Sequence, residues 1–167
     1  AGIGTEGTWK TECVDCGKQM NTGTIPALVK IDVAKLTVAK PVKDAAAAKA
    51  TTTDSAYTVA NTEWTAADGT ILTVGQNFNA GTVYTVKITL KAKENNVFTA
   101  DSTYNKIEGK DAKLVTAVTG YTDSVILTYT FDATEGTYVP TKPAITTVTL
   151  PDGKVGDAYS QTLAATG

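Results

Sequence analysis

Within residues 83–93, apolar and polar side chains alternate strictly from Tyr84 onward. The apolar positions, all of one parity, are Tyr84, Val86, Ile88, Leu90 and Ala92. The positions between them are Thr85, Lys87, Thr89, Lys91 and Lys93. Because successive side chains of a β-strand point to opposite faces, this period of two predicts a strand with one buried and one solvated face.

Residues 124–131 repeat this pattern, with Val125, Leu127, Tyr129 and Phe131 on one face. Shorter apolar stretches separated by turn residues predict further strands at 57–59, 63–65, 71–74, 97–98 and 114–118. The alanine run 45–48 is too short to nucleate a helix, so we expect a loop there, with a helical turn as the alternative. Many short strands without a helix predict an all-β fold, specifically an antiparallel β-sandwich.

The first strand of this sandwich changes phase along its length. Ile31 and Val33 lie on one parity, whereas Leu36 and Val38 lie on the other. A shift of one residue exchanges the two faces of a strand, so we expect a bulge or kink at residues 34–35.

Composition divides the chain into four parts. Residues 1–28 are rich in Gly and Thr and predict a Cys-containing tail with one small hairpin, and 29–134 form the sandwich. Residues 135–143 contain two prolines, which stiffen a linker. Residues 144–167 are interpreted as the opening strands of a following module, since Pro26-Ala27 recurs as Pro143-Ala144 one domain length later.

Several segments resemble known bacterial surface modules. The pieces VKIDVAKLTVAKPV, EWTAADG, NAGTVYTVKITLKAKENNVF and VILTYTF, spread over residues 28–134, resemble the immunoglobulin-like repeats of large Gram-positive surface proteins. LPDGKVGDAYSQTLAATG, within 143–167, is similar to the start of cadherin-like or putative Ig domains. WKTECVDCGKQMNTGTIPA is similar to the tail of small Cys-containing repeats that lie between such domains.

These resemblances imply an immunoglobulin-like antiparallel β-sandwich. They also imply an extracellular module, on the bacterial cell surface or secreted, without catalytic residues or a cofactor. Its partners would be adjacent immunoglobulin-like modules of the same chain, and a host glycan or host protein. We therefore expect a non-catalytic structural spacer or adhesion module. The alternatives are a ligand-binding module or an accessory domain of a secreted glycoside hydrolase.

Composition argues against several other functions. The chain has no His, and all 15 basic residues are lysine, so the usual general base and the usual phosphate clamp are missing. We therefore expect no enzymatic activity. The net charge of -2 without a basic stripe argues against nucleic-acid binding. No run of about 18 apolar residues occurs, which argues against membrane insertion.

Cys13 and Cys16 form a lone C-x-x-C pair. They could form a local disulfide, remain free thiols, act as a redox pair or supply half of a metal site. A zinc site needs four ligands, so the pair is a weak metal candidate, and a disulfide or two thiols is the simpler interpretation.

Three aromatic residues, Trp64, Tyr84 and Trp9, could be part of the core or have another role. Trp64 fits either a core tryptophan or a sugar-stacking platform, and its apolar neighbours favour the core. Tyr84 fits either a tyrosine corner, with its hydroxyl bonded back to the main chain, or a plain core residue. Trp9 lies in the tail and should be partly exposed.

The remaining polar candidates lack a motif that joins them. The scattered carboxylates, expected to be solvated, are Asp101, Glu108, Asp111, Asp123, Asp132 and Glu135. Asp152 and Asp157 are spaced as turn residues more than as calcium ligands. Lys35, Asn61 and Asn79 could take part in an isopeptide cross-link, which requires a buried lysine. The loop 94–123, with Asn95-Asn96, is the place where a ligand site would be sought.

Overall fold

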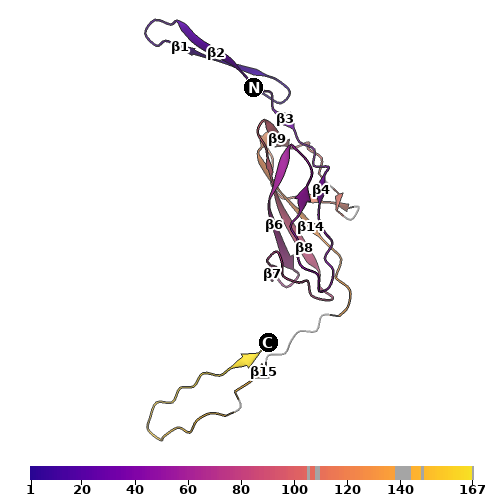
Figure 1. Ribbon diagram of the computed structural model, residues 1–167, viewed down its shortest axis with the longest axis vertical. Helices are drawn as coiled ribbons and strands as arrows, with labels where there is room; N and C mark the ends of the chain where they lie inside the picture. The colour runs from indigo at the N-terminus through magenta and orange to yellow at the C-terminus, as the bar shows by residue number, and fades with distance from the viewer. Residues whose placement is uncertain (105, 108–109, 138–143, 148, 167) are drawn as a thin grey trace. The chain divides into compact units, whose positions relative to one another are not determined.

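The computed structural model describes residues 1–104, 106–107, 110–137, 144–147 and 149–166 (Figure 1). Every regular element in these residues is a β-strand, which confirms the predicted all-β class. The chain divides into two compact units, Ala1–Gly136 and Thr137–Gly167. The boundary falls inside the predicted linker, of which residues 138–143 lie outside the described residues.

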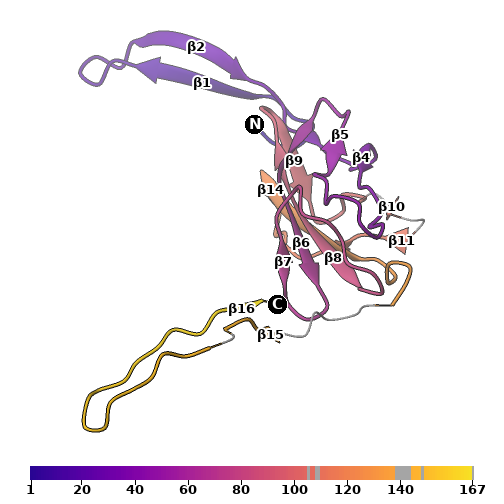
Figure 2. The same ribbon diagram turned by 60° about the horizontal axis from the view of Figure 1, so that its bottom comes forward.

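The larger sheet has five antiparallel strands in the order β12-β14-β8-β6-β7. Figure 2 labels β6, β7, β8 and β14 of this sheet. Their bounds are β6 Tyr57–Ala66, β7 Ile71–Leu72, β8 Tyr84–Ala92, β12 Lys113–Leu114 and β14 Ser124–Thr130. In the centre of the sheet, Ile88 of β8 lies opposite Leu127 of β14. The two strands with the clearest alternation are therefore neighbours, and their apolar faces point to the same side.

A smaller sheet has three strands in the order β13-β9-β3, with β3 parallel to β9. Their bounds are β3 Val29–Lys30, β9 Asn96–Thr99 and β13 Tyr121–Thr122. Two short strand pairs complete this unit's sandwich part, β4 Leu36–Thr37 with β5 Thr51–Thr52 and β10 Lys106–Ile107 with β11 Lys110–Asp111.

Apolar side chains of both sheets form one core. The largest fully buried ones are Trp64, Tyr57, Tyr84, Phe98, Ile88, Leu90, Leu127, Val86 and Val125. They include the predicted inner faces of β8 and β14, together with Phe98 from the second sheet. Each such side chain contributes about 1.5–3 kcal/mol when removed from water, so this shared interior holds the two layers together.

Trp64 lies at the centre of an aromatic group. Its ring centroid is 5.1 Å from that of Phe78 and 5.7 Å from that of Phe131. Its Nε1–H donates a hydrogen bond of 2.8 Å to the Ala48 carbonyl oxygen, which satisfies the one polar atom of the indole. The side chain is fully buried, so the core interpretation is confirmed and Trp64 is not a surface platform.

Two strand predictions need correction. Residues 57–59 and 63–65 belong to one strand, β6, whose register against β8 shifts between Val59 and Asn61. This bulge moves the buried positions from Tyr57 to Thr62, Trp64 and Ala66, which have the opposite parity. The phase change looked like two strands because a bulge and a break leave the same signal in a sequence.

The first strand is broken where the phase change predicted a kink. β3 ends at Lys30 and pairs with β9, whereas β4 begins at Leu36 and pairs with β5. Ile31, Val33 and Leu36 are all buried, although they do not share one parity. The irregular connection between β3 and β4 lets side chains of both parities reach the core.

The terminal segments form simple ribbons. The predicted hairpin near the N-terminus is present, as β1 Gly7–Glu12 paired with β2 Gln19–Ile25. In the second unit, β15 Ala144–Ile145 pairs with β16 Ala165–Thr166. The first of the opening strands predicted in 144–167 is thus only two residues long.

The chain enters and leaves the sandwich at opposite ends. At the entry, Val29 N–H donates to the carbonyl oxygen of Asn95, just beyond the C-terminal end of β8. At the exit, Thr134 N–H donates to the carbonyl oxygen of Thr82, just before the N-terminal end of β8. The nine residues of β8, at about 3.3 Å each, separate the two points by about 30 Å (Figure 1).

Two buried tyrosines differ in how their hydroxyl groups are satisfied. The Tyr84 hydroxyl accepts a 2.8 Å hydrogen bond from the Asn79 N–H five residues upstream, which is the back-bond of a tyrosine corner. The Tyr57 hydroxyl has no partner among the described residues, although the side chain is fully buried.

We expect the same substitution to have opposite outcomes at these two sites. Tyr84→Phe leaves the Asn79 N–H without its acceptor and should lower the free energy of unfolding by about 1–2 kcal/mol. Tyr57→Phe removes a buried polar atom that makes no bond and should be neutral or stabilising. Urea unfolding of both variants measures the difference, and equal losses at the two sites would contradict this assignment.

Candidate functional site

A turn after β9 and the end of β3 are joined by their main chains. Ile31 N–H donates to the Val97 carbonyl oxygen at 2.9 Å, and Val33 N–H donates to the Thr103 carbonyl oxygen at 2.8 Å. The turn itself is closed by a 2.9 Å hydrogen bond from Thr99 N–H to Ser102 Oγ. Ser and Thr hydroxyls commonly bond to nearby main-chain groups in this way, so the local sequence specifies the turn.

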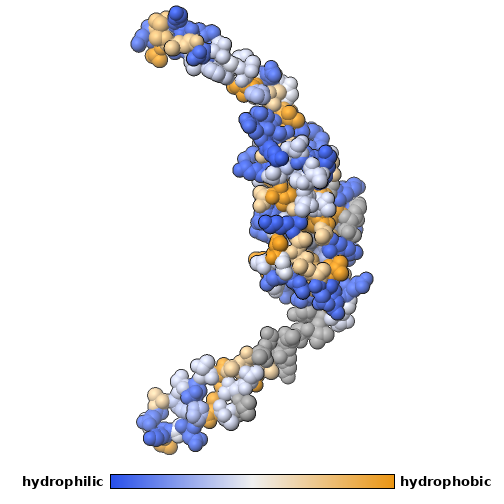
Figure 3. Space-filling model, viewed as in Figure 1, coloured by the Kyte–Doolittle hydropathy of each residue, from blue (hydrophilic) through white to orange (hydrophobic). Residues whose placement is uncertain are grey.

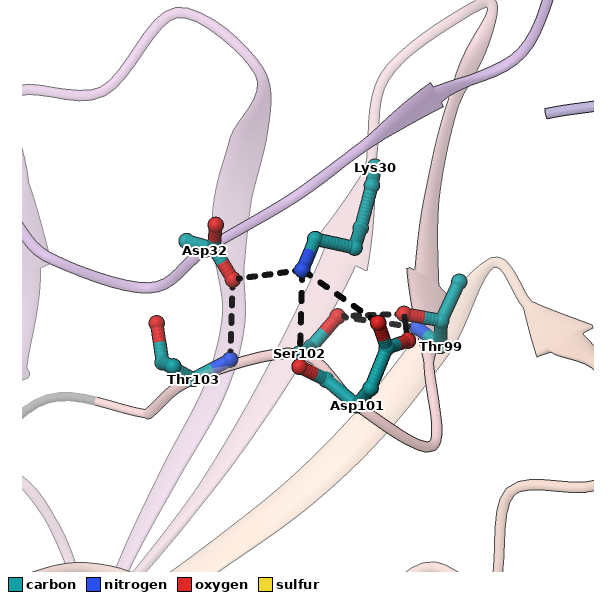
Figure 4. A network of polar contacts seen from close by, with 6 residues as sticks. All are labelled: Lys30, Asp32, Thr99, Asp101, Ser102 and Thr103. Carbon is teal, nitrogen blue, oxygen red and sulfur yellow. Dashed lines mark hydrogen bonds and ion pairs between the residues drawn. The ribbon is translucent and has the colours of Figure 1, made fainter. Parts of the chain in front are cut away.

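Charged side chains add to this junction (Figure 4). Lys30 Nζ lies 3.6 Å from Asp32 Oδ1 and 3.5 Å from Asp101 Oδ2. Asp32 Oδ1 also accepts a 2.9 Å hydrogen bond from Thr103 N–H, and Asp101 Oδ1 accepts one of 2.6 Å from the Thr99 hydroxyl. We call this group the β3 clasp; its members are Lys30, Asp32, Thr99, Asp101, Ser102 and Thr103.

Both carboxylates of the β3 clasp favour the ionised form. The hydrogen bond from the Thr103 main chain lowers the pKa of Asp32, and Lys30 adds to the effect. The hydrogen bond from Thr99 lowers the pKa of Asp101, again with a smaller contribution from Lys30. A general acid at neutral pH needs a raised pKa, so neither carboxyl group is suited to donate a proton. Their ionised form instead strengthens the contacts that hold β3 against the turn after β9.

The clasp should make stability depend on acid pH. A lowered pKa gives stability that is present above the ordinary aspartate value of 3.8 and is lost as the pH falls through the folded-state value. At pH 7, Asp32→Ala should cost about 1 kcal/mol, because the side chain is half-exposed. Urea unfolding at pH 7 and at about pH 2 should show this difference shrinking in acid. A difference that is unchanged or larger in acid would contradict the assignment.

The other carboxylates do not converge on a site. Asp111 on β11 pairs with Lys106 on β10 at 3.6 Å, and both are exposed. Glu108 lies outside the described residues. The side chains that lie on the surface are those of Asp123, Asp132, Glu135, Asp152 and Asp157. Among the described residues, no group of three or more His, Cys, Asp or Glu side chains could hold a metal ion.

The residues considered for an isopeptide cross-link do not include the buried lysine that the reaction needs. Lys35, Asn61 and Asn79 are all exposed. Asn61 instead donates a 3.1 Å hydrogen bond to Glu63, a neighbour on the same strand. The buried lysine that the reaction needs is therefore not supplied by Lys35.

The two cysteines lie in the loop of the β1–β2 hairpin. Both are free thiols in the structure, so the predicted disulfide remains a prediction. Hydrogen bonding from Cys16, and then from the main chain of Asp15, lowers the pKa of the Cys13 thiol. The thiols border a surface hollow whose lining residues are Cys13, Cys16, Lys18, Gln19, Met20 and Asn21.

The loop singled out for ligand binding begins with a tight turn. Asn95 has a φ of 60°, a left-handed conformation that asparagine adopts more readily than most residues. Its carbonyl oxygen accepts the Val29 N–H, and Asn96 donates a 2.8 Å hydrogen bond to the Glu94 carbonyl oxygen. Asn95 and Asn96 therefore lie where β8 turns into β9, and both contact the start of β3: Asn95 through its carbonyl oxygen and Asn96 by pairing with Val29.

Aromatic side chains that could stack on a sugar are separated. Trp9 on β1 and Tyr121 on β13 are about half-exposed, whereas Trp64 is in the core. On the face of the sandwich seen in Figure 3, hydrophobic residues form small areas among hydrophilic ones.

Sequence reasoning considered Asp101 but missed its partners in the β3 clasp. The run Asp101-Ser102-Thr103 is typical of a turn and could have been recognised. Lys30 could not be assigned to it, because 71 positions separate the two ends of that contact. Only the parallel pairing of β3 with β9 brings them together.

Comparisons with known proteins identify no relative. No family model matches the sequence, and the searches of curated proteins and of solved structures found no match.

In the part of the chain that the structure describes, no helix is long and apolar enough to cross a membrane.

Proposed function

We propose that the chain is a non-catalytic spacer or adhesion module of a large bacterial protein, either on the cell surface or secreted. The observation that carries this proposal is the placement of entry and exit about 30 Å apart, at the two ends of β8. A domain with this geometry lengthens the chain in which it sits and passes tension from one neighbour to the next.

The direction of β3 suits a domain under tension. β3 runs parallel to β9, so a pull along the chain shears the strand and loads its hydrogen bonds together. The bonds involved include those from Val29 and Ile31, and the β3 clasp adds ion pairs at Lys30. Bonds that share a load resist it better than bonds that open one at a time.

The proposal also rests on the closed interior and on the sequence resemblance. The described side chains between the sheets are mostly apolar, and the clustered charges serve the β3 clasp. The resemblance to immunoglobulin-like repeats of surface proteins supplies the finer expectation of an immunoglobulin-like topology, with similar modules before and after the sandwich.

Single-molecule stretching of the whole chain tests the spacer function. About 105 residues lie between Val29 and Thr134, so unfolding of the sandwich should add about 340 Å of contour length in one event. Asp32→Ala should lower the force of that event without changing the length gained. A chain that extends at low force without a discrete event would contradict the proposal.

A second candidate function is the binding of a host glycan or protein. Tyr121 favours it, because this half-exposed aromatic side chain lies on β13, an edge strand of the smaller sheet. A glycan array probed with the whole chain should then show binding that Tyr121→Ala removes. Binding that persists in that variant would exclude this surface.

A further inference from the structure

All the sulfur atoms of the chain gather at one place. The 167 residues include two cysteines and one methionine, and Cys13, Cys16 and Met20 line the same hollow at the end of the β1–β2 hairpin. The rest of the lining is Lys18, Gln19 and Asn21, so no carboxylate is present. A hollow bordered by two thiols and a thioether is chemically soft.

The loop that carries the two thiols is closed by its main chain. Cys13 N–H donates to the Lys18 carbonyl oxygen at 2.8 Å, and Gly17 N–H donates to the Cys13 carbonyl oxygen at 2.9 Å. Gly17 has a φ of 67°, which a residue with a side chain adopts only with strain. These features hold Cys13 and Cys16 within one turn, with both side chains on the hollow.

A bulge brings Met20 to the same hollow. Thr11 pairs with Asn21 and Glu12 pairs with Gln19, so Met20 lies between the two registered pairs. In a regular strand, consecutive residues would face opposite sides. Here residues 19–21 all border the hollow, because the bulge changes the direction of the side chains.

We propose that this hollow binds one monovalent copper ion, Cu(I), through the Cys13 and Cys16 thiolates and the Met20 thioether. Soft sulfur ligands select Cu(I), which accepts three-coordinate sites. A structural zinc site takes four ligands from Cys, His, Asp and Glu, and the lining of the hollow supplies only two of these. Mg²⁺ or Ca²⁺ would need oxygen ligands with charge.

The charges at the site fit a monovalent ion. Two thiolates and one Cu(I) leave a single negative charge, and the Lys18 side chain at the edge of the hollow carries a compensating positive charge. Binding requires both thiols to lose their protons, so affinity should rise with pH. It also requires reduced cysteines, since a disulfide between Cys13 and Cys16 would remove both thiolate ligands.

The test is a titration of the whole reduced chain with Cu(I), in competition with a chromogenic Cu(I) chelator and with a reductant that is not a thiol. We expect one ion per chain. Cys13→Ser and Cys16→Ser should each abolish binding that competes with the chelator. Met20→Leu keeps the size of the side chain but removes the sulfur, and should weaken binding at least about tenfold.

Val14→Ala is the matched control, since Val14 lies in the same loop, is fully exposed and does not line the hollow. It should bind Cu(I) as the parent does. All four variants should unfold in urea like the parent, which shows that the sandwich is intact. Three results would overturn the proposal. They are an unchanged affinity in Met20→Leu, a stoichiometry of one ion per two chains, and displacement of Cu(I) by an equal concentration of Zn²⁺.

Discussion

Trp64→Ala will lower the free energy of unfolding by about 3–5 kcal/mol. Trp64 is fully buried between Phe78 and Phe131, so truncation leaves a large cavity among rings that cannot all move to fill it. The substitution also leaves the Ala48 carbonyl oxygen without its donor. Urea unfolding followed by circular dichroism measures the change without relying on tryptophan fluorescence.

Trp9→Ala provides the matched control for this prediction. Trp9 is half-exposed on the hairpin, where its indole lies over Gly23, its cross-strand partner. Its loss should change the stability of the sandwich by less than about 0.5 kcal/mol. A loss of similar size at Trp9 and Trp64 would contradict the placement of Trp64 in the core.

Ile88→Ala will cost about 2–5 kcal/mol. Ile88 is fully buried in the central strand β8, opposite Leu127 of β14, and its removal leaves a cavity between the sheets. The expected result is a lower urea midpoint with an unchanged slope, since the same surface is exposed on unfolding.

Lys91→Ala tests the opposite face of the same strand. Lys91 is exposed, so its truncation should change stability by less than about 0.5 kcal/mol. The pair of variants therefore measures the alternation of β8 directly. If Lys91→Ala were as damaging as Ile88→Ala, the assignment of the two faces would be wrong.

Most of the sandwich could be predicted because its central strands obey a simple rule. The alternation in residues 83–93 gave β8 to within one residue at each end, and the buried residues are those of the predicted face. β14 followed in the same way. In both strands, one apolar face meets the core and the other meets solvent, so the pattern in the sequence is unambiguous.

Irregular elements could not be predicted so well. β6 was divided into two strands because the bulge after Val59 reverses the parity of the buried positions. β12 is two residues long, although residues 114–118 carry a strand-like pattern. In such segments, the structure depends on which strands pair with each other, and the local sequence pattern does not show which strands will be neighbours.

The residues of the candidate sites were harder to predict than the fold. The C-x-x-C pair was recognised, but Met20 was not connected with it, because the bulge that brings it to the hollow depends on the register of β1 and β2. The β3 clasp joins residues 30 and 101 through a parallel strand pairing. A local sequence pattern can identify each of the two segments, but it does not show that the two segments lie next to each other.

The closed core can be tested most directly by hydrogen exchange at the two indole Nε1–H groups, measured by NMR on the whole chain. Trp64 Nε1–H is buried and bonded to the Ala48 carbonyl oxygen, so it should exchange only when the sandwich opens. Trp9 Nε1–H lies on a half-exposed side chain and should exchange rapidly. Rapid exchange at both indoles would show that the two sheets do not enclose Trp64, and would contradict the account.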